Sequence, residues 1–426
     1  MDKLVVEGGH QLKGQVRISG AKNAALPLMA ASILADGPWR LTNLPVLGDL
    51  LTMGRLLTFM GGRVELGQKD PRQNPNEAEL DLTMLSKPEA PHELVKTMRA
   101  SALVLGPLLA RLGRAKVSLP GGCAIGVRPI DLHIKALRAM GAIFDLSGGD
   151  IVGRVPEGGL KGAEIRFETV TVTGTENLMM AATLARGRTI LANAAREPEV
   201  VDTGQALLAM GAQIEGLGTD TIIIDGVSSL KGGSYQVTPD RIEAGTLLAA
   251  VALAGGEITL VDFPHEALGT VVAKLRETGL ILTALGSDML AQAPDSLSAA
   301  DITTQPHPGF PTDMQAQFMA MMTAAKGVSV ITETIFENRF MHVGELRRLG
   351  ADITLEGRTA VVRGASCLSG APLTASDLRA SASLVLASLA ARGVSQIHRV
   401  YHLDRGYERL DRKLISLGAV ISRVPA

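Results

Sequence analysis

The sequence predicts an α/β protein with two domains, each built from three repeats that alternate helices and strands. Three observations support this fold class. The chain has 426 residues, too many for one hydrophobic core at roughly 100–200 residues per domain. Two short signatures recur through its whole length. Hydrophobic residues make up 46% of the chain but aromatic ones only 3%, so aliphatic side chains fill the cores, as in closely packed helices and sheets.

The first signature is an apolar residue or Thr, then Gly, usually Ala, and an alternating strand-like run. It predicts a helix that is closed by a glycine and followed at once by a strand. The copies recur about every 70 residues, with a longer first interval, and begin at Met60, Met140, Met210, Thr278, Leu349 and Leu417.

The second signature is an Ala/Leu/Met-rich helix that ends near a glycine and precedes a β-branched strand. It predicts helices at 23–35, 100–112, 176–186, 242–254, 314–326 and 380–392. Six such units indicate an internally symmetric α/β architecture, with three units per domain and residues 231–234 as a candidate linker. Ancestral duplication alone would explain the apolar positions of the repeat, but not its polar ones.

Composition excludes several classes of function. A net charge of −1 argues against the broad basic surface of a nucleic-acid-binding protein. Two cysteines, Cys123 and Cys367, cannot form a disulfide framework, and neither a CxxC pair nor a Cys/His cluster offers a zinc site. The chain begins without the apolar core of a signal peptide, and no apolar run approaches the ~18 residues of a membrane span. We expect a soluble cytoplasmic protein with no metal, cofactor, membrane contact or obligatory protein partner.

Basic residues recur where the long helices begin. Aligning these helices on their terminal glycines gives equivalent places to Lys22 or Asn23, Arg99, Thr173, Arg241, Asp313 and Arg379. A cation is disfavoured by the dipole at a helix N-terminus. It is explained if an anion binds there, because the free N–H groups and the cation then act together. The alternative is a side chain that extends into solvent, which we favour for Arg241.

The exception is Asp313, for which two interpretations stay open. Thr312 and Gln315 have the spacing of a capping box, and an acid in the first turn stabilises a helix by ~0.3–1 kcal/mol. Alternatively, an acid among Lys22, Arg99 and Arg379 can serve as a general base on a hydroxyl, because the cations suppress its protonation.

The segment at 119–129, LPGGCAIGVRP, contains Cys123 and predicts a loop. Its three glycines and flanking prolines are incompatible with a regular helix or strand around Cys123. Arg128 can stabilise a thiolate or bind an anion. The alternative is an ordinary turn with a buried structural cysteine. We expect His133 and His398 to be structural.

Together these residues predict a cationic pocket between the domains with one thiol and one carboxylate. Arg405 precedes Gly418 by the same interval as Arg128 precedes Gly141, and Arg339 stands near that place in the fifth unit. One domain then offers Lys22, Arg99, Cys123 and Arg128, and the other Asp313, Arg339, Arg379 and Arg405. Such a pocket suits a small polyanionic substrate.

Seven segments, spread in order over nearly the whole chain, carry a family resemblance: SGAKNAALP at 19–27, KTMRAS at 96–101, PGGC at 120–123, FPTDMQAQ at 310–317, FENRF at 336–340, DLRASAS at 377–383 and DRGYE at 404–408. Together they resemble one branch of the enolpyruvyltransferase family, the UDP-N-acetylglucosamine 1-carboxyvinyltransferases (enolpyruvyl-UDP-GlcNAc synthases). The related shikimate-pathway enolpyruvyltransferases share the fold but lack the PGGC loop.

The resemblance implies two inside-out α/β barrel domains, 22–238 and 1–21 with 239–426. It implies transfer of the enolpyruvyl group of phosphoenolpyruvate to the 3-hydroxyl of UDP-N-acetylglucosamine, with release of phosphate through a tetrahedral intermediate, as the first committed step of peptidoglycan synthesis. Cys123 would protonate the phosphoenolpyruvate methylene and react with fosfomycin, and Asp313 would take the hydroxyl proton. Lys22, Arg128 and Arg405 would hold phosphate, and Arg339 and Arg379 would lie at the phosphoenolpyruvate site.

Contacts with the nucleotide sugar are implied for a further set: Asn23, Arg99, Arg128, Pro129, Ile130, Asp131, Leu132, Thr169, Val170, Thr171, Val172, Asp313 and Ile335. The four residues at 169–172 match the family pattern more loosely than the others. Two alternatives stay open: a non-catalytic nucleotide-sugar-binding paralogue, and a shikimate-pathway enolpyruvyltransferase.

Overall fold

The structure is a computed structural model that describes residues 2–67, 76–96, 98–118, 130–364 and 367–426. Its contacts divide the described chain into two compact units. The central unit comprises residues 20–118 and 130–238, and the terminal unit comprises residues 2–19 and 239–426. Each unit has its own hydrophobic core.

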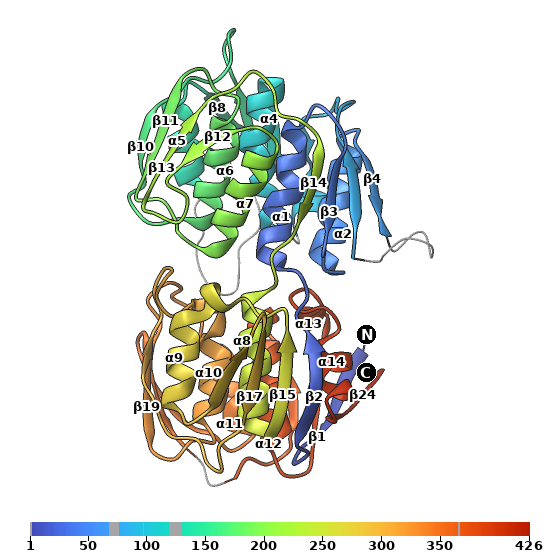
Figure 1. Ribbon diagram of the computed structural model, residues 1–426, viewed down its shortest axis with the longest axis vertical. Helices are drawn as coiled ribbons and strands as arrows, with labels where there is room; N and C mark the ends of the chain where they lie inside the picture. The colour runs from blue at the N-terminus through green and yellow to red at the C-terminus, as the bar shows by residue number, and fades with distance from the viewer. Residues whose placement is uncertain (1, 68–75, 97, 119–129, 365–366) are drawn as a thin grey trace. The chain divides into compact units, whose positions relative to one another are not determined.

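Three four-stranded sheets of one topology form among the described residues of the central unit (Figure 1). In each, the first two strands are parallel and the other neighbours antiparallel. The orders are β14 (Gly233–Gln236), β3 (Trp39–Thr42), β5 (Ala78–Asp81), β4 (Arg63–Leu66); β6 (Glu89–Ala90), β7 (Arg114–Ser118), β9 (Asp150–Arg154), β8 (Ile143–Ser147); and β10 (Glu164–Arg166), β11 (Arg188–Ala192), β13 (Thr221–Asp225), β12 (Gln213–Glu215).

The predicted linker at 231–234 is wrong. Gly233 pairs with Trp39 in the parallel ladder between β14 and β3, so this segment completes a sheet of the central unit. The chain leaves that unit after Thr238 instead. The composition of the segment predicted a flexible connection, but the backbone ladder with a strand almost 200 residues earlier in the chain decides its structure.

The terminal unit repeats the plan with strands from both ends of the chain. Its orders are β2 (Leu12–Arg17), β15 (Gly256–Val261), β17 (Asp288–Gln292), β16 (Ile281–Leu285); β18 (Ile302–Thr303), β19 (Val328–Thr332), β21 (Thr359–Arg363), β20 (Asp352–Glu356); and β22 (Pro372–Thr374), β23 (Val394–His398), β1 (Asp2–Glu7), β24 (Val420–Pro425). β1 lies between β23 and β24, with Glu7 opposite Val420, so both termini lie in one sheet (Figure 1).

Long helices that are apolar on nearly every side occupy the core of each unit. Such helices are stable only when they are buried all round, and every residue of α10 is buried. The core helices lie close to the six predicted ranges, although α6 begins before the expected residue 176 and ends before 186. They are α1 (Lys22–Ala31) with η1 (Ser32–Leu34), η3 (Arg99–Val104) with α4 (Leu105–Leu112), α6 (Val172–Ala182), α8 (Arg241–Ala254), η5 (Thr312–Met314) with α10 (Gln315–Met322), and α12 (Leu378–Ala390).

The second set of helices ends at the six signature glycines. These are α2 (Gly48–Phe59), α5 (Asp131–Ala139), α7 (Pro198–Ala209), α9 (Gly269–Glu277), α11 (Val343–Arg348) and α14 (Leu410–Ser416); shorter helices are α3 (His92–Val95), η4 (His265–Leu268) and α13 (Tyr401–Asp404). The signature glycines have φ between 95° and 104°, which closes the helix in the left-handed region and turns the chain into the next strand. The predicted α/β fold of six repeats is confirmed.

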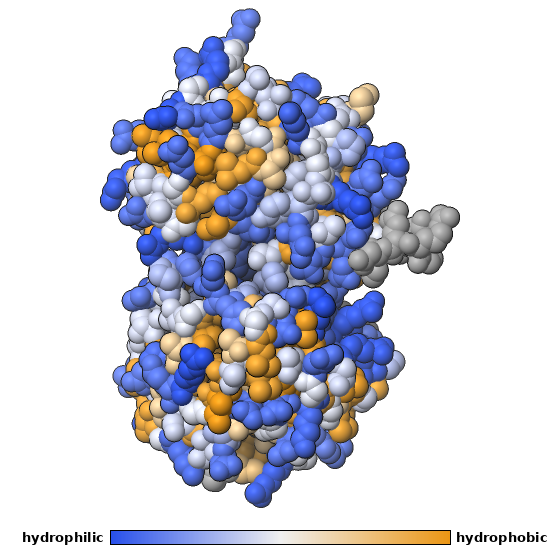
Figure 2. Space-filling view, in the orientation of Figure 1, coloured by the Kyte–Doolittle hydropathy of each residue, from blue (hydrophilic) through white to orange (hydrophobic). Residues whose placement is uncertain are grey.

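The surface mixes polar and apolar side chains. Figure 2 shows apolar patches on this face of both units, interrupted by hydrophilic residues. Single exposed apolar residues on sheet strands, such as Ile281 and Val328, are normal for globular proteins. Within the described ranges, no helix combines the length and the hydropathy that crossing a membrane requires.

Candidate functional site

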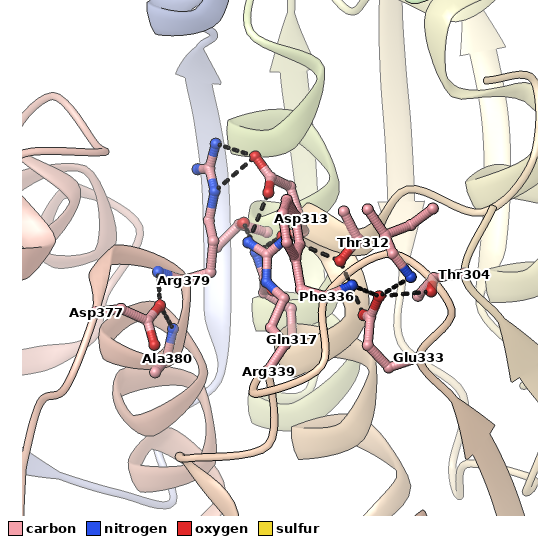
Figure 3. Close-up of polar contacts among 12 residues, drawn as sticks. Thr304, Thr312, Asp313, Gln317, Glu333, Phe336, Arg339, Asp377, Arg379 and Ala380 are labelled. Atoms are coloured by element: carbon pink, nitrogen blue, oxygen red, sulfur yellow. Dashed lines mark hydrogen bonds and ion pairs between the residues drawn. The ribbon is translucent and has the colours of Figure 1, made fainter. Parts of the chain in front are cut away.

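Two arginines hold the carboxylate of Asp313 in the terminal unit (Figure 3). Arg339 Nη2 donates to Oδ1 at 2.6 Å. Arg379 donates to Oδ2 through Nη2 at 2.9 Å and through Nε at 3.2 Å. Both arginines are almost fully buried, so their charges are weakly screened. The pair therefore stabilises the ionised, proton-accepting form of Asp313.

The local sequence explains how Arg379 reaches this position. Asp377 caps α12, and its Oδ1 accepts the N–H groups of Arg379 and Ala380 at 2.9 Å each, as expected of an aspartate at a helix start. The Arg379 guanidinium lies over the ring of Tyr407 at 5.1 Å, a favourable cation–π contact. Its Nη1 has no hydrogen-bond partner among the described residues, which leaves a donor for an anionic ligand.

The predicted capping box at Thr312 and Gln315 is wrong. The helix start has no side-chain cap, and both polar atoms of the buried Gln315 side chain lack a hydrogen-bond partner among the described residues. Thr312 Oγ1 donates to Glu333 and accepts from Arg339 Nη1, both at 2.8 Å. The threonine therefore serves the ionic cluster rather than the helix.

The prediction that Arg241 extends into solvent is also wrong. Arg241 begins α8 as expected, but it is only 7% exposed. It lines a small hollow of about 90 Å³ with residues of η4 and the loop at 307–311. Sequence spacing placed its backbone correctly, but the packing of α8 against η4 determines where the side chain goes.

Two further predicted residues of the terminal unit, Ile335 and Arg405, lie shortly after regular elements of that unit. Ile335 follows β19, and its N–H donates to Glu333 Oε1 at 2.8 Å. Arg405 follows α13 and is half-buried. Sequence reasoning missed Glu333, which directly follows β19 and carries no motif of its own.

In the central unit, Lys22 is held by a carboxylate that the sequence analysis also missed. Lys22 Nζ lies 2.7 Å from Asp49 Oδ2, and both side chains are at most 10% exposed. Asn23, the next residue of α1, is exposed although all the other residues of that helix are buried. The start of α1 therefore presents an amide to solvent beside a buried cation. Asp49 lies in the first turn of α2. An acid at such a position is usually explained by its stabilising interaction with the helix dipole, so the sequence contained no separate signal for its contact with Lys22.

A buried amide joins three of the predicted nucleotide-sugar segments. Asn177 of α6 accepts from Gly106 N at 2.6 Å, donates to Ala102 O at 3.0 Å, and lies 2.8 Å from His133 Nδ1. It thereby ties α6 to η3 and α4 and to α5. Burial lowers the pKa of His133 to about 4, so the imidazole is neutral near pH 7. The structural role predicted for His133 is confirmed.

The starts of those elements carry the predicted residues themselves. Arg99 begins η3, Ile130 precedes α5, and Asp131 and Leu132 open it. Thr169 and Val170 lie in the loop before α6, Thr171 caps that helix by accepting from Gly174 N at 3.2 Å, and Val172 begins it. Cys123, Arg128 and Pro129 lie outside the described residues.

We expect Gly106→Ala to destabilise the central unit. An added Cβ would lie 2.2 Å from Asn177 Oδ1 and 2.4 Å from Asn177 O. The hydrogen bond from Gly106 N to Asn177 Oδ1, which joins α4 to α6, must therefore be distorted. The expected loss is about 1–3 kcal/mol, measured by urea unfolding. Gly48→Ala is the matched control, because a Cβ there meets nothing within 4 Å. An equally stable Gly106→Ala protein would show that this close approach is unimportant.

Comparisons with known proteins cover the whole chain. The family model for EPSP synthase (3-phosphoshikimate 1-carboxyvinyltransferase) matches residues 6–414. A UDP-N-acetylglucosamine 1-carboxyvinyltransferase of Nitratidesulfovibrio vulgaris (strain DSM 19637 / Miyazaki F) is 57% identical over 426 residues, and one of Myxococcus xanthus (strain DK1622) is 55% identical over 426 residues. Both alignments cover 100% of each chain.

Solved structures show the same architecture. The enolpyruvyl transferase NikO from Streptomyces tendae superimposes with a TM-score of 0.90 at 25% identity, covering 100% of this chain and 99% of that one. An EPSP synthase from Acinetobacter baumannii gives a TM-score of 0.77 at 18% identity, with 100% of both chains covered. The enolpyruvyltransferase-like fold predicted from the sequence is confirmed.

Proposed function

Because the chain belongs to the UDP-N-acetylglucosamine 1-carboxyvinyltransferases of the enolpyruvyltransferase family, we infer that it transfers the enolpyruvyl group of phosphoenolpyruvate to the 3-hydroxyl of UDP-N-acetylglucosamine. Phosphate is released, and the product enters peptidoglycan synthesis. The observation that carries this conclusion is identity of more than half of all residues over the full length of the relatives.

We propose that Asp313 is the base. It accepts the proton of the sugar 3-hydroxyl while the hydroxyl oxygen attacks C2 of phosphoenolpyruvate, and the Cys123 thiol protonates the methylene carbon to give a tetrahedral intermediate. The thiolate left on Cys123 then takes a proton from that methyl group while phosphate departs, which restores the double bond in the product and the thiol on the protein. The two guanidinium groups on Asp313 support this role, because they keep the carboxylate ionised.

The basic residues are proposed to bind the charged groups of the substrates. Lys22, Arg128 and Arg405 hold phosphate, and Arg339 and Arg379 hold the carboxylate end of phosphoenolpyruvate. The Nη1 donor of Arg379, which no other described residue engages, supports this assignment. The nucleotide sugar is assigned to Asn23, Arg99, residues 128–132 and 169–172, Asp313 and Ile335, and the tie through Asn177 supports a common role for three of these segments.

We further propose that the two units are the functional domains, 22–238 and 1–21 with 239–426, and that catalysis requires residues of both. A reaction with a reactive enolpyruvyl intermediate benefits when closure excludes water. Substrates of this kind are intracellular metabolites, so the proposed location is the cytoplasm.

One assay tests the activity against both alternatives. Purified protein is mixed with phosphoenolpyruvate and UDP-N-acetylglucosamine, and phosphate release is followed; each substrate alone is the blank. A parallel reaction contains 3-phosphoshikimate in place of the nucleotide sugar. We expect release only with UDP-N-acetylglucosamine. Release with 3-phosphoshikimate instead would identify the shikimate-pathway activity, and binding of the nucleotide sugar without release would identify a non-catalytic paralogue.

A further inference from the structure

Glu333 is a buried carboxylate with a complete set of hydrogen bonds. Its side chain has no solvent exposure. Oε1 accepts from Thr304 Oγ1 at 2.9 Å and from the N–H groups of Ile335 and Phe336 at 2.8 and 3.1 Å, and Oε2 accepts from Thr312 Oγ1 at 2.8 Å (Figure 3). Moving a carboxylate out of water costs free energy that its hydrogen bonds at best offset, and an apolar side chain is often as stable at such a position. A contribution to stability therefore does not explain why a glutamate stands here.

The Oε2 contact leads directly to the base. A threonine hydroxyl has one proton, and here it is donated to Glu333. The lone pairs of Thr312 Oγ1 are then left to accept from Arg339 Nη1 at 2.8 Å. The other terminal nitrogen of Arg339 donates to Asp313. Glu333 thus determines the direction of a hydrogen-bond chain that ends at the Asp313 carboxylate.

The Oε1 contacts lead to the same arginine by a second route. They fix the backbone at Ile335 and Phe336 in the turn after β19. The guanidinium of Arg339 lies 5.2 Å from the centre of the Phe336 ring, a cation–π contact. One carboxylate therefore orients Arg339 both through a hydroxyl and through an aromatic ring.

We propose that Glu333 is a positioning residue for enolpyruvyl transfer: it holds Arg339, through Thr312 and Phe336, in the orientation that presents Asp313 to the sugar hydroxyl. The inference rests on the proposed role of Asp313 as base. It also explains why a charged residue directly follows β19, where an apolar residue would be easier to bury.

Glu333→Gln tests the hydrogen-bond route with little change of shape. The amide oxygen can still accept at the Oε1 position, but the amide nitrogen must donate to Thr312 Oγ1. It then competes with Arg339 for the lone pairs of that oxygen and leaves the hydroxyl proton without its acceptor. We expect kcat for phosphate release to fall on the order of 10- to 100-fold, with the KM for UDP-N-acetylglucosamine changed by less than about threefold.

Substitutions at Thr312 separate positioning from stability. Thr312→Val removes the hydroxyl and is expected to lose as much kcat as Glu333→Gln, whereas Thr312→Ser keeps the hydroxyl and is expected to recover most of that loss. The matched control is Thr323→Val. Thr323 is buried at the other end of α10, where its hydroxyl donates to Ala320 O, and this variant is expected to keep the wild-type kcat.

The outcomes distinguish this inference from the proposed function. If the wild-type protein and Thr323→Val release no phosphate, the proposed function itself fails. If they do, and Glu333→Gln or Thr312→Val retains the wild-type kcat, the positioning role is overturned. It is also overturned if Thr312→Ser is as slow as Thr312→Val, or if each variant loses rate only in proportion to the fraction unfolded at the assay temperature.

Discussion

Asp313→Asn is expected to lower kcat by about 10²- to 10⁴-fold, the usual contribution of a general base, while UDP-N-acetylglucosamine still binds. Asparagine keeps the size of the side chain, but its amide has no oxygen that can take the sugar proton. The substitution also replaces one of the two oxygens that now accept from Arg339 and Arg379. An NH₂ group takes its place, which can donate but cannot accept a hydrogen bond from an arginine. Steady-state phosphate release gives kcat, and titration calorimetry gives the affinity for the sugar nucleotide.

The control for this variant is Asp301→Asn in the same unit. The carboxylate of Asp301 accepts the N–H of Val330 at 2.7 Å, a structural bond that an amide oxygen can replace. We expect this protein to turn over at the wild-type rate. Turnover near the wild-type rate by Asp313→Asn as well would limit Asp313 to holding the two arginines.

Cys123→Ser is expected to reduce turnover by more than about 10²-fold and to abolish alkylation by fosfomycin. A thiol has an ordinary pKa of ~8.5 and can give up its proton near neutral pH, whereas a serine hydroxyl is a far weaker acid. Phosphate release measures the first effect, and intact-protein mass spectrometry after exposure to fosfomycin measures the second.

Cys367→Ser is the matched control, because Cys367 is the other cysteine of the chain. It is half-buried, and its thiol donates to Leu368 O at 3.2 Å, a bond that a hydroxyl can make. We expect full activity and full alkylation from this variant. Full activity from Cys123→Ser would instead remove that thiol from the mechanism and leave proton delivery to another group.

The sequence by itself determined the repeat architecture of this protein. Local patterns suffice for it. A glycine such as Gly61 or Gly418 permits the positive φ that closes a helix, and a helix with apolar residues on nearly every side, such as α10, is expected in a core. The same spacing placed Lys22, Arg241, Asp313 and Arg379 at equivalent helix starts, because a backbone position depends mainly on nearby residues.

Only the tertiary structure decided what the side chains at those positions contact. The partners of Lys22, Arg339 and Asp313 come from other elements, up to 66 residues away in the chain in the case of Asp313 and Arg379. Capping therefore failed as an explanation of Thr312, solvent exposure failed for Arg241, and Glu333 carried no signal at all. A hydrogen bond between side chains that are distant in the sequence depends on how the fold brings their two segments together. A local pattern of residues does not contain that information.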